Sequence, residues 1–158
     1  MIIREVNEKD VGDILSLIQA KADFDGCLDS LRSKEEEIRD AFLSAEPKAK
    51  AIVAEVNEKV IGIATFYNIY STFIAKPGIW LDDLYVYEGY RKTGAGKALM
   101  NSLCKIALNT GCGRIDWIVA RDNENGRGFY ESIGAQIFEN VRHSRLDERA
   151  ITKLAKNT

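Results

Sequence analysis

Two adjacent carboxylates and a basic, glycine-containing turn lie close together in this sequence. Asp82 and Asp83 interrupt an apolar run from Ile79 to Val86, and residues 91–97, which read Arg-Lys-Thr-Gly-Ala-Gly-Lys, follow it. A carboxylate can take a proton from a reacting group. Unpaired N–H groups at the start of a helix, together with the positive end of its dipole, favour a phosphate or pyrophosphate. The stretch therefore predicts a proton acceptor beside an anion-binding turn.

Spacing separates this turn from two common phosphate-binding motifs. A Walker loop requires G-x-x-x-x-G-K-[ST], and no Lys-Ser or Lys-Thr pair follows Gly94. A dinucleotide-binding fingerprint requires G-x-G-x-x-G, and Leu99 stands where the third glycine belongs. Gly94 and Gly96 lack a Cβ, so the backbone can approach an anion closely, and Arg91 and Lys92 add full charges. We predict an anion cradle here; an ordinary strand–helix turn is the alternative interpretation.

Length and composition indicate one globular domain over residues 1–158. Of the 158 residues, 46% are hydrophobic and 29% are charged, and a net charge of −2 gives no general reason to expect nucleic acid or an anionic membrane as partner. The three cysteines, Cys27, Cys104 and Cys112, lack metal-ligand spacing, which fits reduced thiols. No apolar run approaches about 18 residues, and the N-terminus does not have the pattern of a signal peptide. We therefore expect a soluble cytoplasmic protein.

Hydrophobic periodicity predicts an alternation of strands and helices. Ser33 and Glu36 form a capping-box pattern at the start of a helix, and Lys76-Pro77-Gly78 predicts a turn. A helix between the strands at 79–86 and 114–119 would make those two strands parallel. The expected strands are 2–6, 51–56, 60–67, 79–86, 114–119, 136–141 and 149–154, and the expected helices begin after Asn7 or Asp10, at Ser33, at Gly94 and near 124–133.

The paired aspartates create a geometric conflict within the strand 79–86. Because successive side chains of a regular strand point to opposite faces, one of the two carboxylates would face the core. A β-bulge would resolve this conflict, and bulges are common beside active sites. We therefore predict a bulge at Asp82 and Asp83 and a functional role for the pair. A pair of solvated carboxylates at the strand end is the alternative interpretation.

Three separated motifs resemble those of the GNAT N-acetyltransferases, in the same order and over nearly the whole chain. They are Ile79-Trp80-Leu81-Asp82-Asp83-Leu84-Tyr85-Val86, then Arg91-x-x-Gly94-x-Gly96, then Asn123-x-x-x-x-x-Phe129-Tyr130 with Gly134 beyond. The resemblance implies an α/β fold, a mixed sheet with helices on both faces in the order β-α-α-β-β-β-α-β-α-β-β. Within that superfamily, the chain resembles the spermidine/spermine (diamine) acetyltransferases and their thialysine-acetylating relatives.

The resemblance implies an enzyme that transfers the acetyl group of acetyl-CoA to a primary amine by direct attack in a ternary complex. Acetyl-CoA would be the co-substrate, no metal would take part, the acceptor would be a small polyamine or diamino acid, and a homodimer is expected. Two other functions stay open. One is acetylation of a different acceptor, such as an aminoglycoside or a protein N-terminus, and the other is non-catalytic sensing of acyl-CoA.

The resemblance also assigns roles to individual residues. Asp82 matches the acidic residue that helps to deprotonate the amine, although those enzymes have Glu there, and Tyr130 directs its hydroxyl at the coenzyme sulfur as general acid. A half-buried tyrosine without a catalytic role, and an Asn123 that is only a helix cap, are the alternatives. The expected acceptor-binding residues are Asp25, Asp82 and Asp83. The expected coenzyme-binding residues are Leu84, Tyr85, Val86, Arg91, Lys92, Thr93, Gly94, Ala95, Gly96, Lys97, Asn123, Arg127 and Tyr130, of which Tyr85 or Val86 would donate its N–H to the oxyanion.

Overall fold

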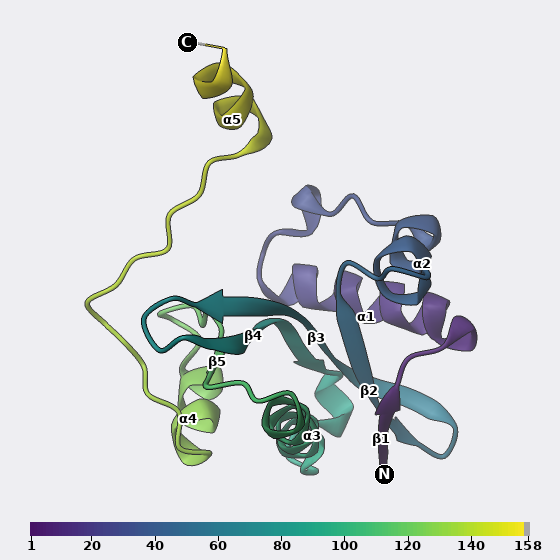
Figure 1. Ribbon diagram of the computed structural model, residues 1–158. Helices are drawn as coiled ribbons and strands as arrows, with labels where there is room; N and C mark the ends of the chain where they lie inside the picture. The colour runs from purple at the N-terminus through teal and green to yellow at the C-terminus, as the bar shows by residue number, and fades with distance from the viewer. Residues whose placement is uncertain (157–158) are drawn as a thin grey trace. The chain divides into compact units, whose positions relative to one another are not determined.

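A five-stranded mixed sheet organises residues Met1–Ile118 (Figure 1). The computed structural model describes residues 1–156, which form two compact units divided between Ile118 and Val119. The expectation of one domain over the whole chain stays a prediction. Among the described residues, no helix has the length and hydrophobicity that crossing a membrane requires.

The strands follow chain order across the sheet, and the first four pair antiparallel with their neighbours. β5 pairs with β4 in parallel, which confirms the prediction made from the intervening helix. Asn57 and Glu58 have φ values of 50° and 62°, the backbone of a tight hairpin turn, and confirm the predicted hairpin between β2 and β3. The bounds are β1 Ile2–Glu5, β2 Lys50–Val56, β3 Lys59–Ser71, β4 Lys76–Val86 and β5 Ile115–Asp116.

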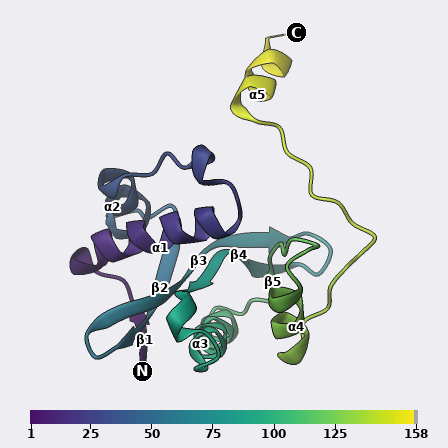
Figure 2. The same cartoon turned by 180° about the vertical axis from the view of Figure 1, so that it is seen from behind.

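Helices cover both faces of this sheet. α1 and α2 lie over one face and α3 lies over the other, as Figures 1 and 2 both show. Val11, Ile14 and Leu17 of α1 are buried with Ile38 of α2 against apolar side chains of β2 and β3. Burial of each such side chain contributes roughly 1.5–3 kcal/mol. The helices are α1 Val11–Phe24, α2 Glu35–Leu43 and α3 Ala95–Asn109, with short 3₁₀ helices η1 Glu8–Asp10, η2 Leu28–Ser30 and η3 Glu88–Tyr90.

The capping box of α2 lies one residue later than predicted. The Lys34 N–H donates to the Glu37 carboxylate at 2.9 Å, in place of the expected Ser33–Glu36 pair. Three consecutive glutamates at 35–37 allow more than one such frame. The frame that forms is the one that starts the helix at Glu35 and buries Ile38.

The predicted turn at Lys76-Pro77-Gly78 is wrong. β4 begins at Lys76, and Pro77 lies opposite Tyr70 of β3. The chain reverses over residues 72–75 instead, where Ala75 has a φ of 51°. Proline is tolerated at the beginning of a strand, so Pro77 does not prevent β4 from starting at Lys76. β5 is also shorter than the predicted 114–119, since its ladder covers two residues.

The second unit begins at Val119 and contains α4, Glu124–Ser132, and α5, Glu148–Ala155. The end of α4 agrees with the prediction of a helix near 124–133. Gly134, with a φ of 91°, follows it in the left-handed conformation that commonly ends a helix.

The two predicted closing strands are wrong. Described residues 136–141 form no strand, and residues 149–154 lie inside α5. The Asp147 carboxylate accepts the Ala150 N–H at 2.7 Å and so caps the first turn of that helix. Apolar residues in this short segment fit a strand or a helix by spacing alone, and the cap is the local feature that selects the helix.

A buried carboxylate ties β1 to the start of α1. Asp10 is 3% exposed, and its two oxygens accept hydrogen bonds from Arg4 at 2.7 and 2.8 Å. The Asn7 N–H donates to the same carboxylate at 2.8 Å, and Arg4 also donates to Glu55 of β2 at 2.7 Å. The hydrogen bonds from Arg4 hold the pKa of Asp10 below its ordinary value, although burial acts in the opposite direction.

Asp10→Asn is expected to lower the free energy of unfolding by about 2 kcal/mol at pH 7, because it removes a charge-assisted hydrogen-bonded pair. The depressed pKa means that the stabilisation is present above the unfolded-state pKa of ~3.9 and is lost as the pH falls through the folded-state value. Urea unfolding at pH 7 and at a series of values below 4 measures the difference between the variant and the unsubstituted protein, which should shrink at low pH. The exposed Asp13→Asn is the matched control; equal losses in the two variants would contradict this account.

Candidate functional site

The predicted bulge in β4 is confirmed. Thr65 of β3 lies opposite Asp83 and Phe66 lies opposite Leu81, so Asp82 is the extra residue between them. Asp82 is exposed and Asp83 is half-buried, whereas Leu81 keeps its place in the core. The irregularity therefore brings two adjacent carboxylates to one site without burying either in the apolar core.

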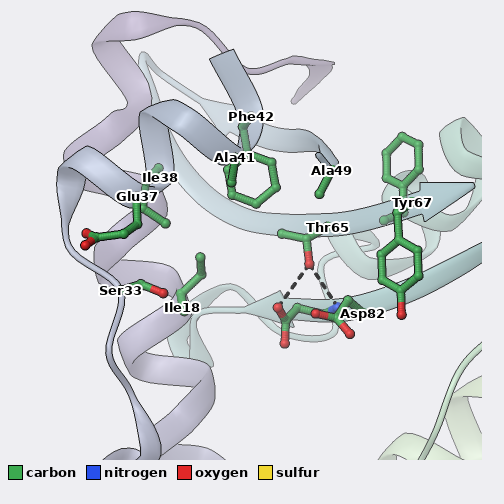
Figure 3. A pocket seen from close by; sticks show the side chains of 12 residues that line it. Ile18, Ser33, Glu37, Ile38, Ala41, Phe42, Ala49, Thr65, Tyr67 and Asp82 are labelled. Atoms are coloured by element: carbon green, nitrogen blue, oxygen red, sulfur yellow. Dashed lines mark hydrogen bonds between the residues drawn. The ribbon is translucent and has the colours of Figure 1, made fainter. Parts of the chain in front are cut away.

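Both carboxylates line a pocket of about 320 Å³. Figure 3 shows side chains of α2 on one side of it and the polar groups of β3 and β4 on the other. Apolar walls with a few carboxylates suit an aliphatic chain that carries a cationic group. The lining residues are Ile18, Ser33, Glu37, Ile38, Ala41, Phe42, Ala49, Thr65, Phe66, Tyr67, Asp82 and Asp83.

The pKa of Asp83 is raised above that of an ordinary aspartate. Burial is the main cause, and the neighbouring charge of Asp82 adds to it. The Thr65 hydroxyl, which donates to the Asp83 carboxylate at 3.0 Å, and the charge of Lys21 act in the opposite direction. Asp25, which was predicted to bind the acceptor, pairs with Lys21 on the last turn of α1 and raises the pKa of Asp83 slightly.

Four polar residues of this pocket were not among the predicted site residues. Thr65 and Tyr67 lie on β3, Glu37 lies on α2, and Ser33 precedes α2. The Tyr67 ring stacks with that of Trp80 at 6.5 Å between centroids, and burial followed by the charge of Asp82 raises the pKa of its hydroxyl. The sequence signal for the two β3 residues is indirect, because Thr65 can be placed opposite Asp83, and Tyr67 opposite Trp80, only once the β3–β4 hairpin is in register.

The turn before α3 has the backbone of the predicted anion cradle. Lys92 and Gly94 have φ values of 62° and 92°, and Gly94 is the N-cap residue of α3. Glycine has no side chain to cap the helix, so the first N–H groups of the helix, at residues 95–97, are available to an anion. The Thr93 hydroxyl donates to the Tyr90 carbonyl at 2.7 Å and braces the turn. Lys92 and Lys97 are exposed beside these groups.

Arg91 has partners that its sequence position did not predict. Its Nε donates to the Val86 carbonyl at 3.1 Å. Its guanidinium lies 4.8 Å from the centre of the Phe24 ring and 5.4 Å from that of Tyr85. These contacts join the turn to α1 and β4, so Arg91 has a structural task here as well as the charge that was expected to bind an anion.

The second half of β4 presents backbone groups on the side away from β3. The Tyr87 N–H donates to the Ile61 carbonyl at 3.0 Å, and alternate residues of an antiparallel strand face the same neighbour. Tyr85 therefore faces β3 as well, whereas Leu84 and Val86 face the opposite side, where β5 pairs only with the first half of β4. Of the two predicted oxyanion donors, Val86 has the N–H with this orientation.

The second unit holds the remaining predicted coenzyme residues, Asn123, Arg127 and Tyr130. Asn123 caps α4 by accepting the Gly126 N–H at 2.9 Å, and a Cβ on Gly126 would come within 2.6 Å of its amide. This glycine is therefore explained by the cap. Arg127 donates to Glu139 at 2.6 Å. Tyr130 is half-buried, and its ring centroid lies 5.3 Å from that of its neighbour Phe129.

Within the part of the chain that the structure describes, no group of three or more His, Cys, Asp or Glu side chains is arranged to hold a metal ion.

Comparison with known proteins gives a family match that covers most of the chain. Residues 17–135 match the model described as "Acetyltransferase (GNAT) family". The chain is 31% identical to the thialysine N-epsilon-acetyltransferase of Mus musculus over 85% of its own length and 83% of that protein. It is 36% identical to the L-ornithine N5-acetyltransferase NATA1 of Arabidopsis thaliana over 69% of its length, and spans about half, 48%, of that protein.

A solved structure has the same fold. It is an integron cassette protein from the mobile metagenome of V. cholerae, with a TM-score of 0.79 and 26% identity. The alignment covers 98% of this chain and 97% of that one. The arrangement of β1–β5 and their helices is thus shared with a protein of almost the same extent.

Asp83→Asn is expected to raise the free energy of unfolding at pH 7. Because the pKa of Asp83 is higher in the folded state, its ionised carboxylate lowers the free energy of unfolding once the pH exceeds the unfolded-state pKa of ~3.9. At lower pH, Asp83 is protonated in the folded and the unfolded protein, and this cost disappears. The gain should therefore fade as the pH falls toward 4, which urea unfolding at several pH values measures. Asp23→Asn, at an exposed position of α1, is the control. A variant that is less stable than the unsubstituted protein at pH 7 would show that the fold requires the anion.

Proposed function

This chain belongs to the GNAT acetyltransferase family and is an acetyl-CoA-dependent N-acetyltransferase, and we propose that its acceptor is a primary amine of a small polyamine or diamino acid. The observation that carries the proposal is the pair of carboxylates at the β4 bulge, Asp82 and Asp83, which line an otherwise largely apolar pocket. Two relatives are named for thialysine and L-ornithine, which both carry more than one amino group.

The carboxylates meet the main chemical requirement of this acceptor. An alkyl ammonium has a pKa near ~10.4, so only about one molecule in a thousand is the nucleophilic free amine at pH 7. Asp82 is exposed and can pass a proton to water, and Asp83 has a raised pKa, which improves it as a proton acceptor near neutral pH. We assign deprotonation to the coupled pair, with Asp82 as the residue in contact with solvent.

The cradle would hold the coenzyme. Acetyl-CoA supplies a thioester that is already activated. The N–H groups at residues 95–97, together with Lys92 and Lys97, would bind its pyrophosphate, and the Val86 N–H would polarise the thioester carbonyl. The left-handed backbone of Lys92 and Gly94 supports this assignment, because turns with such residues form anion-binding concavities of backbone N–H groups.

Residues of the second unit complete the proposal by family resemblance. We assign the role of general acid for the departing thiolate to Tyr130, because a phenol pKa near ~10 is close to that of a thiol. Asn123 and Arg127 would bind the pantetheine and phosphate parts of the coenzyme, although in the structure they also cap α4 and pair with Glu139. A homodimer is proposed on the same basis.

The acceptor is tested by comparing 1,4-diaminobutane, L-ornithine and n-butylamine in an assay of thiol release from acetyl-CoA. We expect kcat/KM to be at least about tenfold higher for the two acceptors with a second amino group, because charge complementarity favours them. Asp82→Asn should lower kcat/KM at pH 7, and the deficit should shrink toward pH 10, where free amine is abundant without a base. Equal rates for the three amines, or a deficit that does not change with pH, would contradict the proposed acceptor.

Gly96→Val, which places a branched side chain in the cradle, separates the coenzyme site from the acceptor site, since it should weaken acetyl-CoA binding in calorimetry.

Tyr130→Phe should lower kcat by roughly 10²–10⁴-fold while leaving acetyl-CoA affinity nearly unchanged, because it removes a proton donor and keeps the ring. Steady-state kinetics and calorimetry measure the two quantities. The comparison variant combines Phe129→Tyr with Tyr130→Phe, so that a hydroxyl stands at the adjacent position. Its kcat should stay as low as that of Tyr130→Phe alone. A loss of less than about threefold would mean that another group protonates the thiolate.

A further inference from the structure

Thr65 makes an unusual pair of contacts with the bulged strand. It is 3% exposed on β3, and its hydroxyl donates to Oδ2 of Asp83 at 3.0 Å while accepting the Asp83 N–H at 3.0 Å. Figure 3 shows both bonds as dashed lines from the one oxygen. A single hydroxyl therefore holds the backbone and the side chain of the same residue.

The Thr65–Asp83 contact lies where the pairing of β3 and β4 is irregular. Tyr87 and Ile61 form a hydrogen-bonded pair. Because alternate residues of a strand face the same neighbour, Tyr85 and Asp83 should also face β3. The register shifts beside the Thr65–Asp83 pair, between Thr65 and Phe66, and the Asp83 N–H donates to the Thr65 hydroxyl. This hydrogen bond holds Asp83 to β3 at the irregularity and so stabilises the bulge.

Packing alone does not call for a hydroxyl at this position. Residues 60–66 read Val-Ile-Gly-Ile-Ala-Thr-Phe, so Thr65 is the one polar side chain in an apolar, buried stretch of β3. Valine has nearly the same shape as threonine and favours strands at least as well. The hydroxyl is thus explained by its bonds to Asp83.

We propose that Thr65 is a positioning residue, whose hydroxyl fixes the Asp83 carboxylate in the pocket and holds the bulge that places Asp82 beside it. The inference rests on the proposed function in one respect, namely that the paired carboxylates serve an acceptor amine. The positioning itself is a property of the free protein.

Several charged or titratable groups face Asp83, and Thr65 acts among them. Asp82 lies on the same strand, Lys21 and Asp25 come from α1, and Glu37 of α2 and Tyr67 of β3 line the same pocket. Thr65 donates directly to the carboxylate, so it stabilises the ionised form. Without that donor, Asp83 would retain its proton to higher pH.

Thr65→Val and Thr65→Ser form a matched pair for the test, because the first keeps the shape and the second keeps the hydroxyl. Carbon-detected NMR titration of the Asp83 carboxyl should show its pKa rise by about one unit in Thr65→Val and change little in Thr65→Ser. Amide hydrogen exchange at Asp83 should accelerate in Thr65→Val alone. Neither readout requires turnover.

Activity gives a second, separate readout. With 1,4-diaminobutane as acceptor, the acidic limb of the kcat/KM profile should move up by about one pH unit in Thr65→Val, while the KM for acetyl-CoA stays unchanged. Thr65→Ala tests the same loss of the hydroxyl if the valine variant does not fold. Unchanged carboxyl titration and exchange in a folded variant without the hydroxyl, or equal changes in the serine and valine variants, would overturn the positioning role. Altered titration with no turnover of any amine would support positioning and refute only the proposed acceptor.

Discussion

One extra residue in β4 is the feature on which the rest of the site depends. Because Asp82 has no partner opposite it on β3, two adjacent carboxylates reach one pocket while Leu81 stays in the core. β5 pairs only with the part of β4 that precedes the bulge, so the N–H groups beyond it, Val86 among them, are not used by β5. A single irregularity thus shapes the proposed acceptor pocket and the strand edge where the thioester would lie.

The bulge brings an unfavourable electrostatic arrangement with it. Burial and the charge of Asp82 both oppose ionisation of Asp83, whereas the Thr65 hydroxyl and Lys21 favour it. The balance leaves the pKa of Asp83 above that of an ordinary aspartate, which would make it a stronger proton acceptor than an ordinary aspartate in the proposed reaction. The Arg4–Asp10 pair, which joins β1 to α1, has the opposite balance, with a depressed pKa, so that the ionised form of Asp10 stabilises the fold. The pKa values of the two aspartates are therefore shifted in opposite directions because the two side chains have different partners.

Much of this arrangement follows from the sequence, since local rules determine it. Strand alternation predicts the bulge at Asp82–Asp83, the intervening helix makes β4 and β5 parallel, and the glycines at 94 and 96 mark the start of α3. The failures occur where one segment fits two structures. The apolar spacing at 149–154 suits a strand or a helix, and the Asp147 cap selects the helix. Thr65 could not be found from local pattern, because its role exists only once β3 and β4 are in register.

The proposed coenzyme site would bind its ligand mainly through backbone groups, and the proposed acceptor site through side chains. Substitutions should therefore affect the two sites differently. The proposed cradle would bind mainly through backbone N–H groups and the helix dipole, with Lys92 and Lys97 adding charge, so it depends on the left-handed backbone of Gly94 and on the absence of a side chain at Gly96. The proposed acceptor pocket would bind through the side chains of Glu37, Tyr67 and the paired aspartates, which come from three elements. Under the proposed function, substitutions on β3 and α2 would therefore alter the choice of amine without disturbing the coenzyme site, and a substitution of Thr65 would also alter the acidity of the Asp83 carboxyl.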